Sequence, residues 1–156
     1  MKWRVLFLCT TNGLHSPMAE AMLRWIDSEH FETTSAGEIH GRVHPLSVEV
    51  LKEIGIDLER ETRQSVQELP DAEFDYVITL GERAPSVHRN FGRAEIVHWR
   101  FDNPAASKDP ERRLRDFRVA RDQILQRLRL FVLVHARPLA TPATLSLKAV
   151  TGATRS

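Results

Sequence analysis

Apolar and polar positions alternate along the chain in two kinds of block, and together these blocks predict an α/β fold. Short runs rich in apolar or β-branched residues are typical of strands, and they cover residues 4–9, 31–37, 74–80 and 95–99. Between these runs, apolar residues recur three or four positions apart, as on one face of an amphipathic helix. Strands that alternate with helices form a parallel sheet covered on both faces. We therefore expect a three-layer sandwich around a four-stranded parallel sheet.

Three prolines indicate where the longer helices begin, because proline suits the first turn of a helix. They are Pro17, with Ser16 as the expected N-cap, Pro45 and Pro110. The apolar faces of these helices are predicted to include Met18, Ala21, Met22, Trp25 and Ile26, then Val48, Leu51 and Ile54, and finally Leu114, Phe117, Ile124, Leu128 and Phe131. Gly55 should end the second helix. Two short helical turns are also predicted, one capped by Ser65 and one over residues 84–88.

Length and composition are those of a single globular domain. The 156 residues are enough for one sizeable core, and a formal net charge of +1 gives no field that favours nucleic acid or a membrane surface. No apolar run has the length of a signal peptide's apolar region or of a membrane span. A single cysteine rules out an internal disulfide, so we expect a cytoplasmic location. We expect a domain over residues 1–135 and a flexible tail over residues 136–156, although residues 145–150 could pair as an extra strand.

One stretch combines a nucleophilic side chain with a turn from strand to helix. The first predicted strand ends at Cys9, a short polar loop containing Gly13 follows, and the first helix begins near Ser16. Backbone N–H groups converge at such a helix N-terminus, and the helix dipole adds about half a positive charge. The same field favours a thiolate over a thiol. The stretch therefore predicts a thiolate facing a bound oxyanion, with a small buried apolar residue as the alternative interpretation of a lone cysteine.

Four separated blocks, in order, make the chain similar to a known family. The blocks are Cys9 to Ser16, Ser35-Ala36-Gly37, Phe74 to Leu80 and His98 to Pro104. Over residues 4–134 the chain resembles the low-molecular-weight protein tyrosine phosphatases, and it is most similar to the arsenate reductases that share their fold. The resemblance implies the same three-layer α/β fold and a reaction carried by a cysteine thiolate in an oxyanion-binding loop.

The resemblance also implies roles for the residues of this loop. Cys9 stands at the position of the family's nucleophile, and Ser16 stands at the position of the hydroxyl that steadies the thiolate. The oxyanion would be held by the loop, whose residues are Thr10, Thr11, Asn12, Gly13, Leu14 and His15. His15 replaces the family's arginine, which grips a tetrahedral oxyanion through two parallel hydrogen bonds. We expect the histidine to face the oxyanion and to bind it less strongly, because histidine is only partly charged near neutral pH.

Two other functional positions depart from the family's pattern. In phosphatases of this family the aspartate of an Asp-Pro pair protonates the leaving oxygen, whereas this chain has Asn103 there and Asp102 one residue earlier as a candidate substitute acid. Related arsenate reductases carry resolving cysteines after the third strand, whereas this chain has Gly81 and then His88. An arsenate reductase with one cysteine would therefore need an external thiol or redoxin as its reductant.

Metal binding is the less favoured interpretation of the remaining polar residues. Zinc ligands could come from Cys9, His15 and His88, but no zinc spacing is present, so we expect no metal site. Positions that bind a cation in some arsenate reductases are occupied by Asn12, Glu20, Ser35 and Thr62, for which ordinary hydrogen bonding is the preferred interpretation. His44 and His98 are interpreted as structural.

Two classes of function follow from these residues. The first is an arsenate reductase-like or low-molecular-weight phosphatase-like enzyme, an oxidoreductase or hydrolase, that uses the Cys9 thiolate with altered or weak activity and has no bound cofactor. The alternative is a catalytically degenerate module that holds an oxyanion or a phosphorylated protein without turning it over. In both classes the expected ligand resembles phosphate or arsenate.

Overall fold

The computed structural model describes residues 1–10, 13–58, 62–87 and 89–135. Its centre is a parallel sheet of four strands, β1 (Trp3–Cys9), β2 (Phe31–Gly37), β5 (Tyr76–Gly81) and β6 (Glu95–Arg100), in the order β2-β1-β5-β6. The strands lie where the apolar runs predicted them, within one or two residues at each end. The predicted four-stranded parallel sheet is therefore confirmed.

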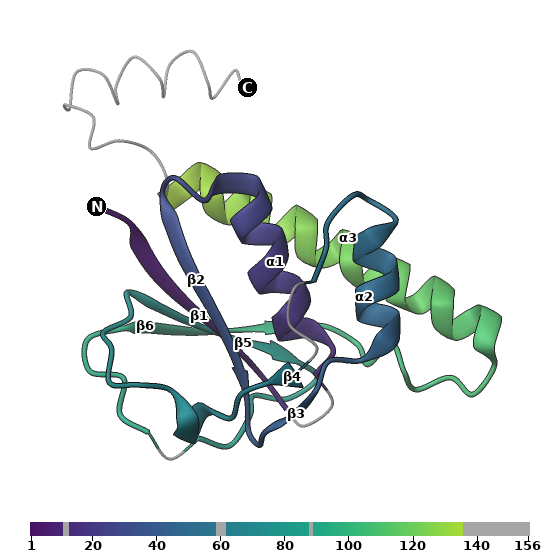
Figure 1. Ribbon diagram of the computed structural model, residues 1–156, viewed down its shortest axis with the longest axis horizontal. Coiled ribbons are helices and arrows are strands. Elements are labelled where there is room, and N and C mark those ends of the chain that lie inside the picture. Colours follow the sequence, from purple (N-terminus) through teal and green to yellow (C-terminus); the bar gives the residue numbers. More distant parts are fainter. Residues whose placement is uncertain (11–12, 59–61, 88, 136–156) are drawn as a thin grey trace, which may run out of the picture.

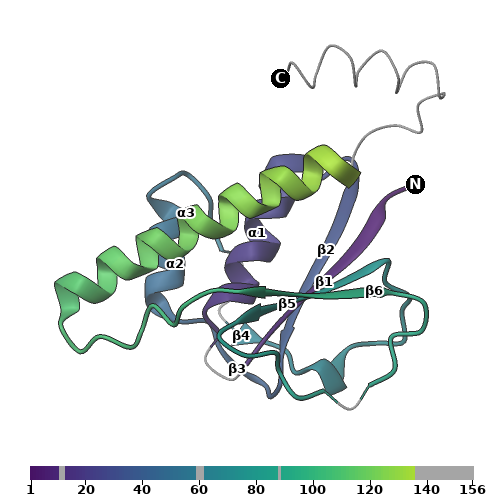
Figure 2. The ribbon, with the colours of Figure 1, turned by 180° about the vertical axis from the view of Figure 1, so that it is seen from behind.

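Three α-helices pack together against one face of this sheet (Figures 1 and 2): α1 (His15–Asp27), α2 (Pro45–Lys52) and α3 (Pro110–His135). Alternate strand residues supply the sheet side of this core, including Val5 and Phe7 from β1, and α3 supplies residues such as Phe117 and Ile124. Successive side chains of a strand point to opposite faces, so the other residues of β1 face away from the helices. This helical layer holds the larger of the two apolar cores.

The opposite face of the sheet is covered by a thinner layer. Leu6, Leu8 and Val77 pack there against Val66 and Leu69, which belong to or follow the short 3₁₀ helix η1 (Val66–Glu68). The turn at η1 was predicted from Ser65, and its capping box is present: the Glu68 carboxylate accepts from the Ser65 backbone N–H at 2.7 Å, and the Ser65 hydroxyl accepts from the Glu68 N–H.

The second predicted turn, over residues 84–88, is wrong for the residues that are described. Residues 84–87 form no helix, and His88 lies outside the described residues. Pro85 disfavours the helical conformation of Ala84. Arg89, just after this segment, anchors it through hydrogen bonds to the backbone carbonyls of Val66, Leu69 and Pro70, at 2.8–2.9 Å. These long-range contacts fix the segment as an irregular cover over the sheet.

The helices can be compared with the starts, ends and buried faces predicted for them. α2 begins at Pro45 as predicted, with His44 as its N-cap, and Gly55, at a φ of +82°, follows its last turn. The prediction that Ser16 caps α1 is wrong, because Leu14 occupies the N-cap position and the Ser16 side chain is bonded elsewhere. The predicted inward position of Trp25 is also wrong: it is 55% exposed, and the buried residues of α1 end at Leu23.

Two very short strands form a second, antiparallel sheet that the apolar pattern did not predict. β3 (Gly41–Arg42) pairs with β4 (Thr62–Arg63), and a bridge between Gly37 and Ser65 joins this region to the end of β2. The four carboxyl ends of the main sheet meet the same region, with Cys9 in register with Gly37 and Gly81 in register with Arg100. The fold thus brings the candidate functional residues together at the carboxyl ends of the strands of the main sheet.

Nothing in the described part of the chain resembles a membrane span, because none of its helices is both long and apolar enough. The predicted tail over residues 136–156, and with it the possible strand over residues 145–150, lies outside the described residues.

Candidate functional site

The site is built on the last residue of β1. Cys9 is 2% exposed, and its Sγ lies 2.8 Å from the hydroxyl oxygen of Ser16 in the first turn of α1. The same hydroxyl lies 3.3 Å from the backbone carbonyl oxygen of Ala36 on β2. A serine hydroxyl has one proton, so it can donate to only one of these groups at a time. It donates to Ala36 when Cys9 is a thiol and to Sγ when Cys9 is a thiolate, which lets Ser16 serve both protonation states.

The loop between Cys9 and α1 turns sharply at Gly13. Gly13 has a φ of +58°, and a Cβ at this position would lie 2.5 Å from the carbonyl oxygen of Arg42. Both the backbone conformation and the close approach therefore require glycine. Thr11 and Asn12 lie outside the described residues, so their predicted oxyanion contacts stay predictions.

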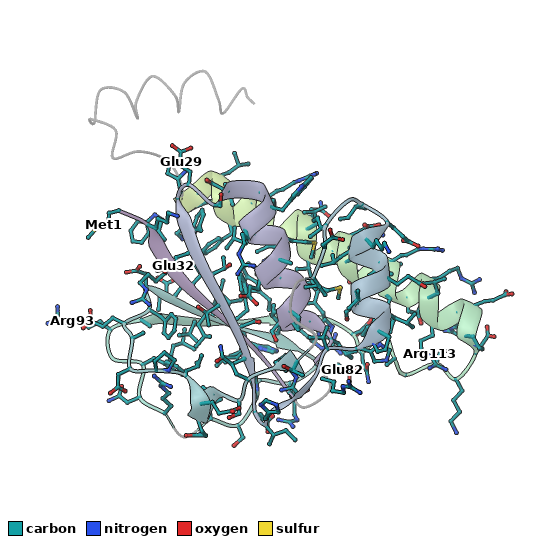
Figure 3. The ribbon with its side chains drawn as sticks, in the orientation of Figure 1. Met1, Glu29, Glu32, Glu82, Arg93 and Arg113 are labelled. Atoms are coloured by element: carbon teal, nitrogen blue, oxygen red, sulfur yellow. The ribbon has the colours of Figure 1, made fainter. Side chains whose placement is uncertain are left out.

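A cavity of about 260 Å³ opens at this end of the sheet. It is lined by Thr10, Leu14, His15, Gly81, Glu82, Arg83 and Asn103. In Figure 3, Glu82 lies at this end of the sheet, whereas Glu32 and Arg93 lie at the opposite end. The cavity therefore joins the predicted loop to the end of β5 and to the segment after β6.

His15, which replaces the family's arginine, is buried beside this cavity and is 5% exposed. Burial lowers its pKa below 6.5, while the backbone carbonyl of Asp102 and the charge of Glu82 oppose the shift. Its Nε2 lies 3.2 Å from that carbonyl oxygen, and its ring stacks on Phe101 at 5.9 Å between centroids. Because a carbonyl can only accept, Nε2 carries the proton and Nδ1 of the neutral ring has a lone pair. In this tautomer the ring has no second N–H to donate to an oxyanion.

The candidate acid Asp102 points its carboxylate away from His15. The carboxylate is 84% exposed and pairs with Arg100 at 3.0 Å, so only the backbone carbonyl of Asp102 contacts the histidine. Asn103 lines the cavity, and its side-chain oxygen accepts from the backbone N–H of Ala105 at 2.9 Å. The role of Asp102 as an acid stays a prediction, since it would require the loop to shift.

The positions linked to cation binding in related reductases are occupied by an internal network. The Glu20 carboxylate accepts from the Ser35 hydroxyl at 2.5 Å and pairs with Arg24 at 2.8 Å. Thr62 lines a cavity next to this pair, and Asn12 lies outside the described residues. Among the described residues no group of three or more histidine, cysteine, aspartate or glutamate side chains is placed to hold a metal ion. His88, the third residue of the zinc alternative, is not among them.

His44 and His98, the two histidines interpreted as structural, contact neighbouring elements. His44 Nδ1 accepts from the Leu46 N–H at the start of α2, and its ring lies 4.8 Å from that of Phe117. His98 Nδ1 lies 2.7 Å from the Thr79 hydroxyl on the neighbouring strand. The interpretation of both residues as structural agrees with these contacts.

Sequence reasoning missed two arginines near the loop. Arg83 lines the same cavity as His15 and pairs with Glu38 at 3.0 Å. Arg63, on β4, is 2% exposed and packs against Gly13 and Gly37. Both arginines lie in polar segments without an apolar pattern, so only the topology brings them to the site.

Comparison with known proteins gives a consistent family. Residues 4–133 match the family described as low molecular weight phosphotyrosine protein phosphatase. An arsenate reductase of Halalkalibacterium halodurans is 37% identical over 130 residues, which are 81% of this chain and 93% of that protein. An arsenate reductase of Brevibacillus brevis is 36% identical over 132 residues, 83% of this chain and 94% of that protein.

Solved structures agree with the sequence relatives. A structure described as an arsenate reductase in the phosphate binding state has a TM-score of 0.69 and 26% sequence identity, and the match covers 85% of this chain and 98% of that one. The predicted resemblance is thus confirmed for the sequence family and the fold. The chain belongs to the low-molecular-weight phosphotyrosine protein phosphatase family, and its similar curated relatives are arsenate reductases.

Proposed function

We propose that this chain binds arsenate or phosphate at the carboxyl end of β1 and reduces arsenate through the Cys9 thiolate. The observation that carries the proposal is the 2.8 Å contact between Cys9 Sγ and the Ser16 hydroxyl, beside the N-terminus of α1. The hydroxyl can donate to a thiolate, and the helix N-terminus favours both the thiolate and a bound oxyanion. The arsenate reductases among its relatives support arsenate as the substrate.

The proposed reaction begins when the Cys9 thiolate attacks arsenic. A sulfur–arsenic bond forms, an arsenic–oxygen bond breaks, and the released oxygen leaves as water after protonation. An external thiol then attacks Cys9 Sγ, and the electron pair of the sulfur–arsenic bond passes to arsenic. Arsenic(V) becomes arsenic(III), arsenite leaves, and Cys9 is held in a mixed disulfide. A second external thiol frees Cys9 and carries away the disulfide.

The reductant in this scheme must come from outside the chain. Cys9 is the only cysteine, so the mixed disulfide cannot be resolved internally. Small thiols such as glutathione or mycothiol, or a redoxin, would supply the two electrons, and a cytosolic setting would provide them. No bound cofactor is needed for the balance of the reaction.

Binding without turnover is the second candidate function. It is favoured by the tautomer of His15, whose Nε2 proton is directed to the Asp102 carbonyl, and by the pairing of the Asp102 carboxylate with Arg100. Loss of one preorganised donor to the reacting group typically slows an enzyme by about 10²–10³-fold. A loop with intact backbone N–H groups would still hold the anion.

One experiment separates the two functions. Arsenite formation is measured for the purified chain with several thiol donors, and aryl-phosphate hydrolysis is measured beside it, for the wild type and for Cys9→Ser. We expect thiol-dependent arsenite formation that disappears in Cys9→Ser. If phosphate binds but the wild type forms no arsenite with any donor, the chain is a binding module. Arsenite formation that survives Cys9→Ser would contradict the assignment of Cys9 as the nucleophile.

A further inference from the structure

Arg63 is a buried cation with unused hydrogen-bond donors. The residue is 2% exposed, and its Nη1 donates to the backbone carbonyl of Ile39. Its Nε and Nη2 are buried and have no partner among the residues that the structure describes. A buried arginine normally has its N–H groups satisfied, because removing a charged group from water without compensation is strongly unfavourable. A buried guanidinium of this kind needs further hydrogen-bond acceptors, which a bound anion would supply.

The guanidinium lies against Gly13 of the oxyanion loop and against Gly37 at the end of β2. A Cβ placed on Gly13, within the loop, would lie 2.9 Å from Arg63 Nε. A Cβ placed on Gly37 would lie 1.5 Å from Arg63 Nη1 and 3.1 Å from the carbonyl oxygen of Thr10. Gly37 is the residue paired with Cys9 in the sheet. A side chain at either position would clash with Arg63, so both positions require glycine. The guanidinium therefore lies beside Gly37, the neighbour of Cys9 in the sheet.

Carboxylates near Arg63 are engaged elsewhere or are not paired with it. Arg63 shares a cavity of about 170 Å³ with Glu20 and Asp57. The two Glu20 oxygens are taken by Ser35 and Arg24, and in the described part of the chain Arg63 makes no ion pair. The other arginine near the loop, Arg83, is already paired with Glu38. Among the described residues, Arg63 is thus a buried positive charge beside the loop that has no carboxylate partner.

We propose that Arg63 supplies the positive charge of the oxyanion site, with Nε and Nη2 as its hydrogen-bond donors. It would do from β4 what an arginine at position 15 would do from within the loop, because His15 is neutral and its only N–H is used. Arginine suits this task because its charge is permanent and its donors form a planar fork. The inference rests on the proposed binding of arsenate or phosphate by the loop.

The test compares Arg63→Met with Arg42→Met in the full chain. Arg42 lies on the paired strand β3, and its side chain is exposed, so the control removes the same charge from the same small sheet. The dissociation constant for inorganic phosphate is measured by calorimetry, and the fraction of Cys9 present as thiolate at neutral pH is measured by ultraviolet absorbance. Thermal unfolding without phosphate is recorded for each variant.

We expect Arg63→Met to weaken phosphate binding by about 10- to 100-fold, the range typical of a hydrogen bond to a charged group. It should also lower the thiolate fraction, because a nearby positive charge is lost, while the unfolding temperature without phosphate stays the same or rises as two unsatisfied donors are removed. Arg42→Met should change neither the phosphate affinity nor the thiolate fraction. Arg63→Lys should recover part of the affinity, since it restores the charge without the fork.

The inference would be overturned if a folded Arg63→Met protein kept the phosphate affinity and the thiolate fraction of the wild type. If Arg63→Met does not fold, Arg63→Gln decides the question, because it keeps an N–H donor and removes the charge; an unchanged phosphate affinity there would overturn the inference equally. If the wild type itself binds no phosphate, both the proposed function and the role of Arg63 fail. If the wild type binds phosphate and the Arg63 variants bind it as well, only the role of Arg63 fails.

Discussion

The contact between Ser16 and Cys9 leads to a prediction about thiol reactivity. Ser16→Ala removes the hydroxyl that lies 2.8 Å from Cys9 Sγ and can donate a hydrogen bond to the thiolate. A hydrogen bond to a charged group contributes about 1.5–3 kcal/mol, whereas one between neutral groups contributes about 0.5–1.5 kcal/mol. Because the thiol form also loses its bond to Ala36, only the difference between these contributions, about 1–1.5 kcal/mol, disfavours the thiolate, and its population should fall by about 10-fold. The folded protein should lose about 1 kcal/mol of stability, from the neutral bond to Ala36.

The assay is the ultraviolet absorbance of the thiolate, which a single cysteine makes unambiguous. Alkylation rates are a poorer measure, because a less acidic thiol gives a more nucleophilic thiolate and part of the effect cancels. The matched control is Ser47→Ala: Ser47 is also fully buried, and its hydroxyl donates to the Leu14 carbonyl at 3.0 Å. It should lose similar stability without changing Cys9. Equal thiolate fractions in Ser16→Ala and the wild type would refute the reasoning.

Three further predictions concern His15 and the irregular cover of the sheet. His15→Arg should tighten phosphate binding by about 10-fold through a charge-assisted bond; unchanged affinity in a calorimetric titration would mean that side chain 15 does not face the anion. The pKa of His15 is lowered in the folded chain, so the unfolded chain binds more protons and stability should fall as the pH drops below 6.5. His15→Gln should flatten this fall in denaturant titrations. An identical dependence of stability on pH in the variant and the wild type would contradict the prediction. Arg89→Ala removes three hydrogen bonds to backbone carbonyls and should destabilise the chain by about 1–3 kcal/mol. Amide hydrogen exchange in residues 82–94 should become faster. Unaltered exchange there would show that other contacts hold the segment.

The sequence was most informative where one physical requirement dominated. Buried parallel strands need continuous apolar runs, so the strand around Cys9 and the strand ending at Gly81 were placed within one or two residues. Pro45 fixed the start of α2 because proline has few other acceptable positions near a helix. The helix-start signal at Ser16 was misleading, because the same hydroxyl can cap a helix or bind a side chain, and here it contacts Cys9.

The parts that escaped prediction depend on contacts between distant segments. The segment over residues 84–87 is held by Arg89 reaching carbonyls about twenty positions away, which no local pattern contains. The burial of Arg63 follows from two glycines that lie in other elements. The orientation of His15 could not be predicted either, because its partner is the backbone carbonyl of residue 102. Every residue has a backbone carbonyl, so the sequence does not indicate which one accepts the hydrogen bond.

The solitary position of Cys9 also determines how the protein would respond to oxidants. A thiolate oxidised by peroxide becomes a sulfenic acid, which is normally rescued when a neighbouring thiol condenses with it. Cys9 has no second cysteine in the chain, so only a thiol from outside can trap its sulfenic acid before further oxidation makes the damage irreversible. Its 2% exposure limits how often a peroxide reaches it, but it limits the rescuing thiol in the same way. The lifetime of the active protein would therefore follow the thiol concentration of its surroundings, even when no arsenate is present.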